Sequence, residues 1–215
     1  SRSEKELVQM LLVQFQKEQS AIRYLASQSP SLITLLSEEN TAVFPLAEPE
    51  EILSDLQARM KNDFPVSSPV PTVTVKDVVP SLEPYSAPAF YLTTPLGDSD
   101  NNVIYINRRN SPQGLELYTT LAHEGYPGHL YQHTFEQLDS YDPIRSLIYV
   151  GGYTEGWGLY SELYAYDFLD MNKTKANALR ALSSLNYAIC ASLDLSVHGM
   201  GWNEAQCVSY LASFG

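Results

Sequence analysis

The chain has 215 residues, 44% of them hydrophobic, which suits one large globular domain or two small ones. Its formal net charge of −12 at pH 7 excludes the basic surface that nucleic acids and anionic lipids require. No apolar run approaches the length of about 18 residues that a membrane-spanning helix needs, so we expect no membrane span.

The N-terminal part of the chain is predicted to be helical. Residues 4–27 carry apolar side chains at helical spacing with charges on the other face, which is typical of one long amphipathic helix. A short helix is expected after Pro30. The run EPEE at residues 48–51 places a proline and carboxylates where they suit a helix N-terminus, and this third helix is expected to end near Asn62.

The next part of the chain changes to strands. Residues 64–94 are rich in proline and contain the alternating run TVTVKDVV, which indicates a strand. The stretches SAPAFYLTT and NNVIYINR indicate two more, separated by the turn composition PLGD at residues 95–98. The stretch NNVIYINR could form the edge of a cleft, to which an extended peptide adds as a further strand. One side of that strand would then carry Val103, Tyr105 and Asn107, and the other Ile104 and Ile106.

From Pro112 to the end of the chain the pattern is helical again. Helices are expected near residues 113–137, 143–169, 174–197 and 203–213. Their ends are marked by DP at 142–143, Asn172 and HG at 198–199. Together the elements predict a mainly α protein with a small central β-sheet, of the α+β class.

The domain organisation expected from these elements has two parts. Residues 1–63 would form an N-terminal helical segment packed on the core, and residues 64–215 the region that carries the chemistry. The chain lacks an initiator methionine and stops within a predicted helix, so we interpret it as a piece of a longer protein, truncated at the C-terminus. This stretch of sequence does not indicate the location of the protein in the cell. An extracytoplasmic location, with the signal segment outside this chain, is compatible with the sequence. Cys190 and Cys207 could form a disulfide or remain two free thiols.

The segment LAHEGYPGHLYQH, residues 121–133, contains three of the four histidines. His123 and Glu124 open the pattern H-E-x-x-H, in which two histidines one helical turn apart bind zinc and the glutamate accepts a proton from the metal-bound water. In this chain the place of the second histidine is taken by Pro127, and the next histidine is His129. That spacing puts the two side chains roughly 120° apart on a regular helix, which prevents them from binding one ion.

Two arrangements remain open for the histidines. Pro127 and Gly128 favour an irregular helix, because proline removes a helical hydrogen bond and glycine tolerates a loosened turn, and such a bulge could bring His129 back to the ligand position. Alternatively, His129 and His133 have the regular spacing of four residues, but Leu130 follows the first of them instead of a glutamate. In either arrangement, three histidines and a glutamate around a helix break favour metal-based catalysis over a buried polar face.

A candidate third ligand lies in YTEGWGLYSELY, residues 153–164. Glu155 and Glu162 are two helical turns apart, on one face, among large apolar residues. A carboxylate there is costly unless it is paired or bound to a metal, and the GWG sequence after Glu155 indicates close approach of another segment. We interpret Glu155 as the ligand and Glu162 as an outer residue that holds a histidine.

The fourth histidine, His198, lies in DLSVHGMGW at an expected helix end. A histidine there could reach a cleft and stabilise a developing oxyanion, or it could interact with the last carbonyl groups of the helix. The residues alone leave both interpretations open.

Three segments together resemble a known family. HEGYPGH with Gln132, then TEGWGLYSE, then DLSVHGMGWNEAQCVSYL are similar to the bacterial family of domain-of-unknown-function 885 proteins (DUF885), which are regarded as zinc-peptidase-like. The family pattern is H-E-x-x-P-G-H-x-x-Q, then E-G-W-A-L-Y-x-E, then D-x-x-x-H-x-x-G-W. The resemblance begins around residues 63–84 and continues to the end of the chain. Gly158 stands where the pattern has alanine, and family members continue past the position where this chain stops.

The resemblance implies a zincin-like metallopeptidase architecture for residues 64–215. It implies Glu124 as the general base and His198 as a residue that stabilises the transition state, which Asp194 could orient. His133 lies outside the family pattern. The metal ligands that the resemblance implies are His123, His129 and Glu155, the last placed like the third ligand of glutamate-type zinc peptidases.

The expected function is therefore that of a zinc-dependent hydrolase of the metallopeptidase type, acting on a peptide or small amide substrate. One zinc ion is the expected cofactor, although two histidines and a carboxylate also suit other divalent metals. The alternative is a non-catalytic or incomplete binding module that retains the fold. Glu124 favours the enzyme, because a module released from catalysis has no chemical need for a general base. The oligomeric state is not encoded in these patterns.

Overall fold

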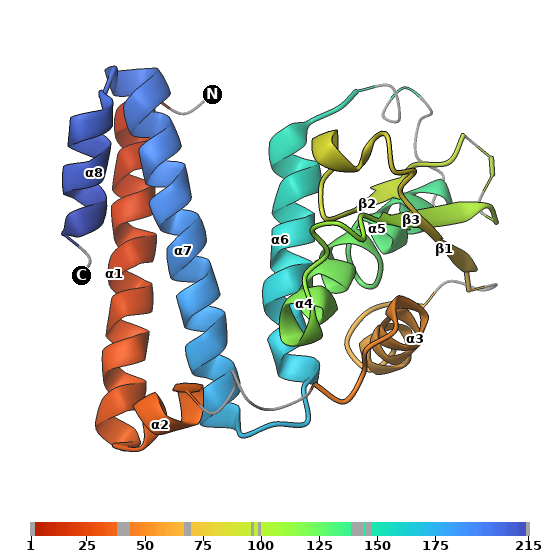
Figure 1. Cartoon of the computed structure of the whole chain (residues 1–215), viewed down its shortest axis with the longest axis horizontal. Coiled ribbons are helices and arrows are strands. Elements are labelled where there is room, and N and C mark those ends of the chain that lie inside the picture. Colours follow the sequence, from red (N-terminus) through yellow and green to blue (C-terminus); the bar gives the residue numbers. More distant parts are fainter. Residues whose placement is uncertain are drawn as a thin grey trace. The chain divides into compact units, whose positions relative to one another are not determined.

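The computed structural model describes residues 3–37, 44–66, 70–95, 97–98, 100–138, 144 and 148–213. Over these residues the chain is mainly helical with one three-stranded sheet, so the prediction of a mainly α protein with a small β-sheet is confirmed (Figure 1). The chain divides into two compact units, one made of Ser1–Thr41 with Met171–Gly215 and the other of Ala42–Asp170. None of the described helices is long and apolar enough to cross a membrane.

The first unit is a set of helices from the two ends of the chain. Its long helices α1 and α7 pack side by side (Figure 1). Helix α1 begins at a capping box, in which the Ser3 and Glu6 side chains each bind the other residue's backbone N–H. Helix α7 begins at Asn172, whose side chain accepts from two backbone N–H groups, and ends at Gly201 with φ +69°. The helices of this unit are α1 (Glu4–Gln28), α2 (Leu32–Ser37), α7 (Lys173–Met200) and α8 (Glu204–Ala212).

The second unit contains the sheet and the helices packed on it. Helix α3 packs against β1 and α4, and α4 also packs against β2. Their side chains Ile52, Leu56 and Leu121 are fully buried. The helices of this unit are α3 (Pro49–Met60), α4 (Gly114–Glu124), α5 (His129–Leu138) and α6 (Gly151–Phe168), with the short 3-10 helix η2 (Glu83–Tyr85). The strands are β1 (Val73–Asp77), β2 (Ala89–Leu92) and β3 (Asn102–Ile106).

The strand order in the sheet is β1-β3-β2. Strand β3 pairs with β1 in parallel and with β2 in antiparallel orientation. Since both edges of β3 are occupied, the expectation that NNVIYINR forms the edge of a cleft is wrong. Among the described strands, β2 is the antiparallel edge strand, and it lies against α4.

The two units divide the chain differently from the expected boundary between residues 63 and 64. Helix α3 belongs with the sheet, and the C-terminal helices α7 and α8 belong with α1. The physical reason is that the apolar face of α1, 25 residues long, needs a partner of similar length, and α7, with 28 residues, supplies it.

The helix boundaries differ from the expected ones in three places. The helix expected at 113–137 is two helices, α4 and α5, and the break expected at residues 198–199 lies at Gly201, so His198 belongs to the last turn of α7. The start expected near residue 143 lies outside the described residues, and the described part of that helix begins at Gly151. Cys190 and Cys207, on α7 and α8, are both free thiols.

Candidate metal centre

The break between α4 and α5 determines the geometry of the site. Helix α4 ends at Glu124, the peptide bond before Pro127 is cis, and α5 begins at His129. Gly128 lies so close to α4 that a Cβ there would collide with the carbonyl oxygens of Ala122 and His123. Only glycine fits such a backbone approach, and this is the irregular helix that the Pro-Gly pair predicts.

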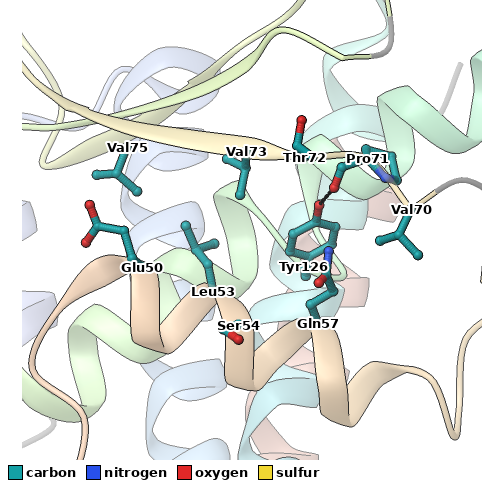
Figure 2. Close-up of a pocket in the computed structure, with 10 residues that line it drawn as sticks. All are labelled: Glu50, Leu53, Ser54, Gln57, Val70, Pro71, Thr72, Val73, Val75 and Tyr126. Carbon is teal, nitrogen blue, oxygen red and sulfur yellow. Dashed lines mark hydrogen bonds between the residues drawn. The ribbon is translucent and has the colours of Figure 1, made fainter.

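Side chains from neighbouring elements hold this break in place. Trp157 Nε1 and Ser161 Oγ, both on α6, donate to the carbonyl oxygen of Pro127 over 2.8 and 3.2 Å. The buried hydroxyl of Tyr126 donates to the carbonyl oxygen of Pro71 over 2.6 Å, beside a cavity of about 320 Å³ between α3 and β1 (Figure 2). The turn that places His129 is therefore anchored both to α6 and to the residues before β1.

The imidazoles of His123 and His129 converge on the carboxylate of Glu155. Glu155 Oε2 lies 3.7 Å from His123 Nε2 and 3.6 Å from His129 Nε2, and one ligand atom from each residue lies within 4.8 Å of the others. Ligands bonded to a tetrahedral zinc ion at 2.0–2.1 Å are about 3.3 Å apart, so small side-chain movements would suffice to close the three groups on one ion. The donor set therefore fits a divalent metal with one position left for water.

Glu162 holds the other nitrogen of His123. Its Oε2 lies 3.2 Å from His123 Nδ1, and its side chain is nearly buried. Burial lowers the pKa of His123, but the hydrogen bond that its Nδ1 donates to Glu162 and the charges of Glu124, Glu162 and Glu155 outweigh this effect, so that the pKa is raised. A proton on Nδ1 leaves Nε2 free as a ligand, which is the outer-residue role predicted for Glu162.

The protonation state of His129 suits metal binding. Burial, together with the neighbouring His123, lowers its pKa and favours the neutral imidazole, the form that binds metal ions. Its Nδ1 is buried without a hydrogen-bond partner among the described residues. A buried polar atom without a hydrogen-bond partner is unusual, and here the atom belongs to a candidate metal ligand.

Glu124 sits at the C-terminal end of α4, half-buried beside the cluster. Its Oε2 accepts a hydrogen bond of 2.9 Å from the backbone N–H of Tyr91 on strand β2. Burial raises its pKa, which makes the carboxylate a stronger base than an exposed glutamate. The structure thus fixes this carboxylate next to the candidate ligands.

The GWG sequence after Glu155 contains one glycine that the packing requires. A Cβ at Gly158 would lie 2.5 Å from His123 Nε2, so α6 approaches the imidazole closely at this point, as the sequence predicts. An alanine, which the family pattern has here, would require the imidazole to shift. A Cβ at Gly156, by contrast, would meet no atom within 4 Å.

His133 takes no part in the cluster. It lies one turn after His129 on α5, where its Nε2 contacts Thr94 Oγ1 at 3.3 Å and Gln137 Nε2 at 2.7 Å. Its ring packs on Tyr91, and burial lowers its pKa. The structure therefore favours the ligand pair across the helix break over the regularly spaced pair.

His198 belongs to the unit of α1 and α7, whereas the cluster belongs to the other unit. Its Nε2 lies 3.6 Å from Asp194 Oδ1, and 76% of each side chain is exposed. This is the pairing that the sequence predicts for Asp194. The role of His198 in transition-state stabilisation stays a prediction.

Two contacts at the site were not expected from the sequence. The hydroxyl of Tyr149 donates to Glu155 Oε1 over 3.1 Å, and the N–H of Tyr91 donates to Glu124. A tyrosine directly before a helix that carries a candidate ligand is a sequence signal for the first contact. The second uses a backbone group, for which no residue type gives a signal.

The comparisons with known proteins agree with the sequence patterns. A protein-family model described as "Bacterial protein of unknown function (DUF885)" matches residues 5–214, so the match includes the N-terminal helices, beyond the segments that carry the resemblance. No curated protein sequence matches the chain. The crystal structure of a protein assigned as a lipoprotein from Colwellia psychrerythraea matches with a TM-score of 0.67 and 21% sequence identity. The match covers 98% of this chain and 39% of that one, and at this identity it shows the fold alone.

Proposed function

The chain belongs to the DUF885 family of bacterial proteins of unknown function, and we propose that it is a metal-dependent hydrolase that cleaves peptide or amide bonds. The observation that carries this proposal is the convergence of His123, His129 and Glu155 within 4.8 Å, next to the half-buried carboxylate of Glu124. Two imidazoles, one carboxylate ligand and a separate carboxylate base are the groups that a metal-activated hydrolysis needs. A zincin-like architecture is part of the proposal.

Each residue of the site has a definite task in this reaction. His123, His129 and Glu155 would hold one divalent ion, with zinc as the first candidate, and the bound ion would lower the pKa of its water and polarise the substrate carbonyl. Glu124 would accept the proton of the attacking water at the carboxylate oxygen that Tyr91 leaves free and would deliver it to the leaving amine. Glu162 keeps the imidazole of His123 in the required tautomer.

The edge strand β2 is where we place the substrate. Its Tyr91 N–H binds Glu124, so the backbone edge turned away from β3 lies beside the proposed base. An extended peptide that paired with the backbone groups of this edge that Glu124 leaves free would present its carbonyl groups near the base. Strand β2 thus takes the role that the sequence assigned to the stretch now seen as β3.

The location in the cell is also proposed to be extracytoplasmic. The solved structure similar to this chain is that of a protein assigned as a lipoprotein, which supports this location. The chain spans 39% of the length of that protein. A role of His198 in transition-state stabilisation is part of the proposal.

The test compares the wild type with Glu124→Gln. We expect the variant to retain the metal content of the wild type, measured by inductively coupled plasma mass spectrometry, and to lose hydrolysis of a peptide library. Glu136→Gln, which changes a carboxylate on α5 that accepts from Tyr153, is the matched control and should hydrolyse normally. Unchanged turnover in Glu124→Gln would remove Glu124 as the base. Metal binding without hydrolysis in the wild type would favour a binding module.

A further inference from the structure

We propose that Tyr149 is a positioning residue of the metal centre, which holds Glu155 so that only one of its carboxylate oxygens reaches the ion. This inference rests on the proposed metal site. The hydroxyl of Tyr149 donates to Glu155 Oε1 over 3.1 Å. The other oxygen, Oε2, is the one that lies 3.7 and 3.6 Å from the two imidazole nitrogens. The two oxygens of this carboxylate therefore have different partners.

The position of the Tyr149 ring follows from the start of α6. Tyr149 precedes Val150, the N-cap residue, whose φ of −118° and ψ of 91° are extended. A Cβ at Gly151 would lie 3.4 Å from Tyr149 Cε1 and 3.6 Å from the hydroxyl oxygen, so the ring lies in contact with the first turn of the helix. From there its hydroxyl reaches the next turn, which carries Glu155.

Glu155 needs such a partner because burial does not hold it. Its side chain is 59% exposed, whereas that of Glu162, which holds His123 from the other side, is 11% exposed. An exposed glutamate occupies several rotamers, and fixing it costs conformational entropy when a metal binds. A hydrogen bond that already selects the productive rotamer reduces that cost and increases metal affinity.

The hydrogen bond also affects the number of ligand atoms. A carboxylate can bind a metal through one oxygen or through both. With Oε1 engaged by Tyr149, Glu155 offers Oε2 alone, so that together with two imidazoles it supplies three ligand atoms and leaves a position for water. Without the hydroxyl, Oε1 becomes free to bind as well, beside the water, which would raise the number of ligand atoms from four to five.

The experiment compares Tyr149→Phe with Tyr153→Phe. Both tyrosines are mostly exposed and lie near the start of α6, but the hydroxyl of Tyr153 donates to Glu136, on α5, instead of to Glu155. Zinc affinity would be measured by competition with a chromophoric chelator. We expect Tyr149→Phe to bind zinc about tenfold more weakly than the wild type, and Tyr153→Phe to bind within about twofold of it.

Cobalt(II) loading adds a spectroscopic measurement that a purely structural role would not change. Four-coordinate cobalt absorbs more strongly in the visible range than five-coordinate cobalt. We expect the visible bands of Tyr149→Phe to weaken and shift, while those of Tyr153→Phe match the wild type.

The possible results separate the two proposals. Affinity and cobalt spectrum of Tyr149→Phe equal to those of the wild type would overturn the role of Tyr149 and leave the metal site intact. A wild-type protein that binds neither ion would overturn the metal site and this inference together. Equal losses in both tyrosine variants would also overturn the inference, because the effect would then belong to the surface at the start of α6 and not to the hydrogen bond on Glu155.

Discussion

The imidazoles of His123 and His129 lie with ring centroids 4.7 Å apart and planes at 85°, although the two residues are six positions apart in the sequence. On a continuous helix they would point roughly 120° apart. The break between α4 and α5 removes this angular separation of the two side chains. Gly128 lies close to the end of α4, which makes the break compact. The spacing that departs from H-E-x-x-H is therefore a different way to bring the same groups together.

Replacing either histidine of α5 by alanine separates the two candidate ligand pairs. We expect His129→Ala to lose the bound metal, because it removes one of the three converging side chains. His133→Ala should retain it, since His133 contacts Thr94 and Gln137 instead. Metal content per chain, measured by inductively coupled plasma mass spectrometry, decides the matter. Loss of metal in His133→Ala with retention in His129→Ala would refute the ligand set.

A methyl group at Gly128 should disturb the helix break. In Gly128→Ala the Cβ meets backbone carbonyl oxygens, which cannot rotate away, and we expect unfolding free energy to fall by about 2 kcal/mol or more, with weaker metal binding. Gly156→Ala is the matched control, because a Cβ there has open space inside a helix and should raise stability by up to about 1 kcal/mol. Urea denaturation of the two variants measures both changes. A Gly128→Ala protein as stable as the wild type would show that the turn can move.

Local sequence patterns predicted helices, strands and candidate ligands of this protein. The features that depend on long-range contacts could not be predicted from them. Apolar periodicity predicted the helices now seen as α1 and α7, but nothing in either segment indicates that they pair with each other. The chemistry of His123, His129 and Glu155 made them candidates, because few other residue types bind metals. The order β1-β3-β2 was not predictable, since each strand alternates in much the same way. The Tyr91 N–H that binds Glu124 is a group that every residue except proline carries, so only the fold identifies it.

Removing the charge of Glu162 should weaken metal binding without removing it. Gln can still accept from His123 Nδ1, but it lacks the negative charge that makes the imidazole a better ligand, so we expect zinc affinity in Glu162→Gln to fall about tenfold. Chelator competition measures the change. Glu136→Gln alters a carboxylate whose observed partner is Tyr153, and it should leave affinity unchanged. Equal affinity in Glu162→Gln and the wild type would mean that Glu162 has only a packing role.

The pH dependence of stability should reveal Tyr126, which anchors the helix break. Burial raises its pKa to about 12, so the folded state favours the protonated phenol more strongly than the unfolded state, whose pKa is about 10. The stabilisation is fully present below pH 10 and is lost as the pH rises towards 12, by up to about 3 kcal/mol for a shift of this size. Urea denaturation between pH 7 and pH 11.5 measures the loss.

The matched variant for this measurement is Tyr126→Phe. It loses the hydrogen bond to the carbonyl oxygen of Pro71, which should cost about 1 kcal/mol at pH 7. Because phenylalanine does not ionise, its stability should then fall less steeply between pH 10 and 12 than that of the wild type. Other tyrosines whose pKa burial raises, among them Tyr91, to about 12, and Tyr118, supply the decline that remains in the variant. Parallel pH curves for the two proteins would mean that Tyr126 ionises without unfolding the turn, and that its hydroxyl is not a necessary anchor.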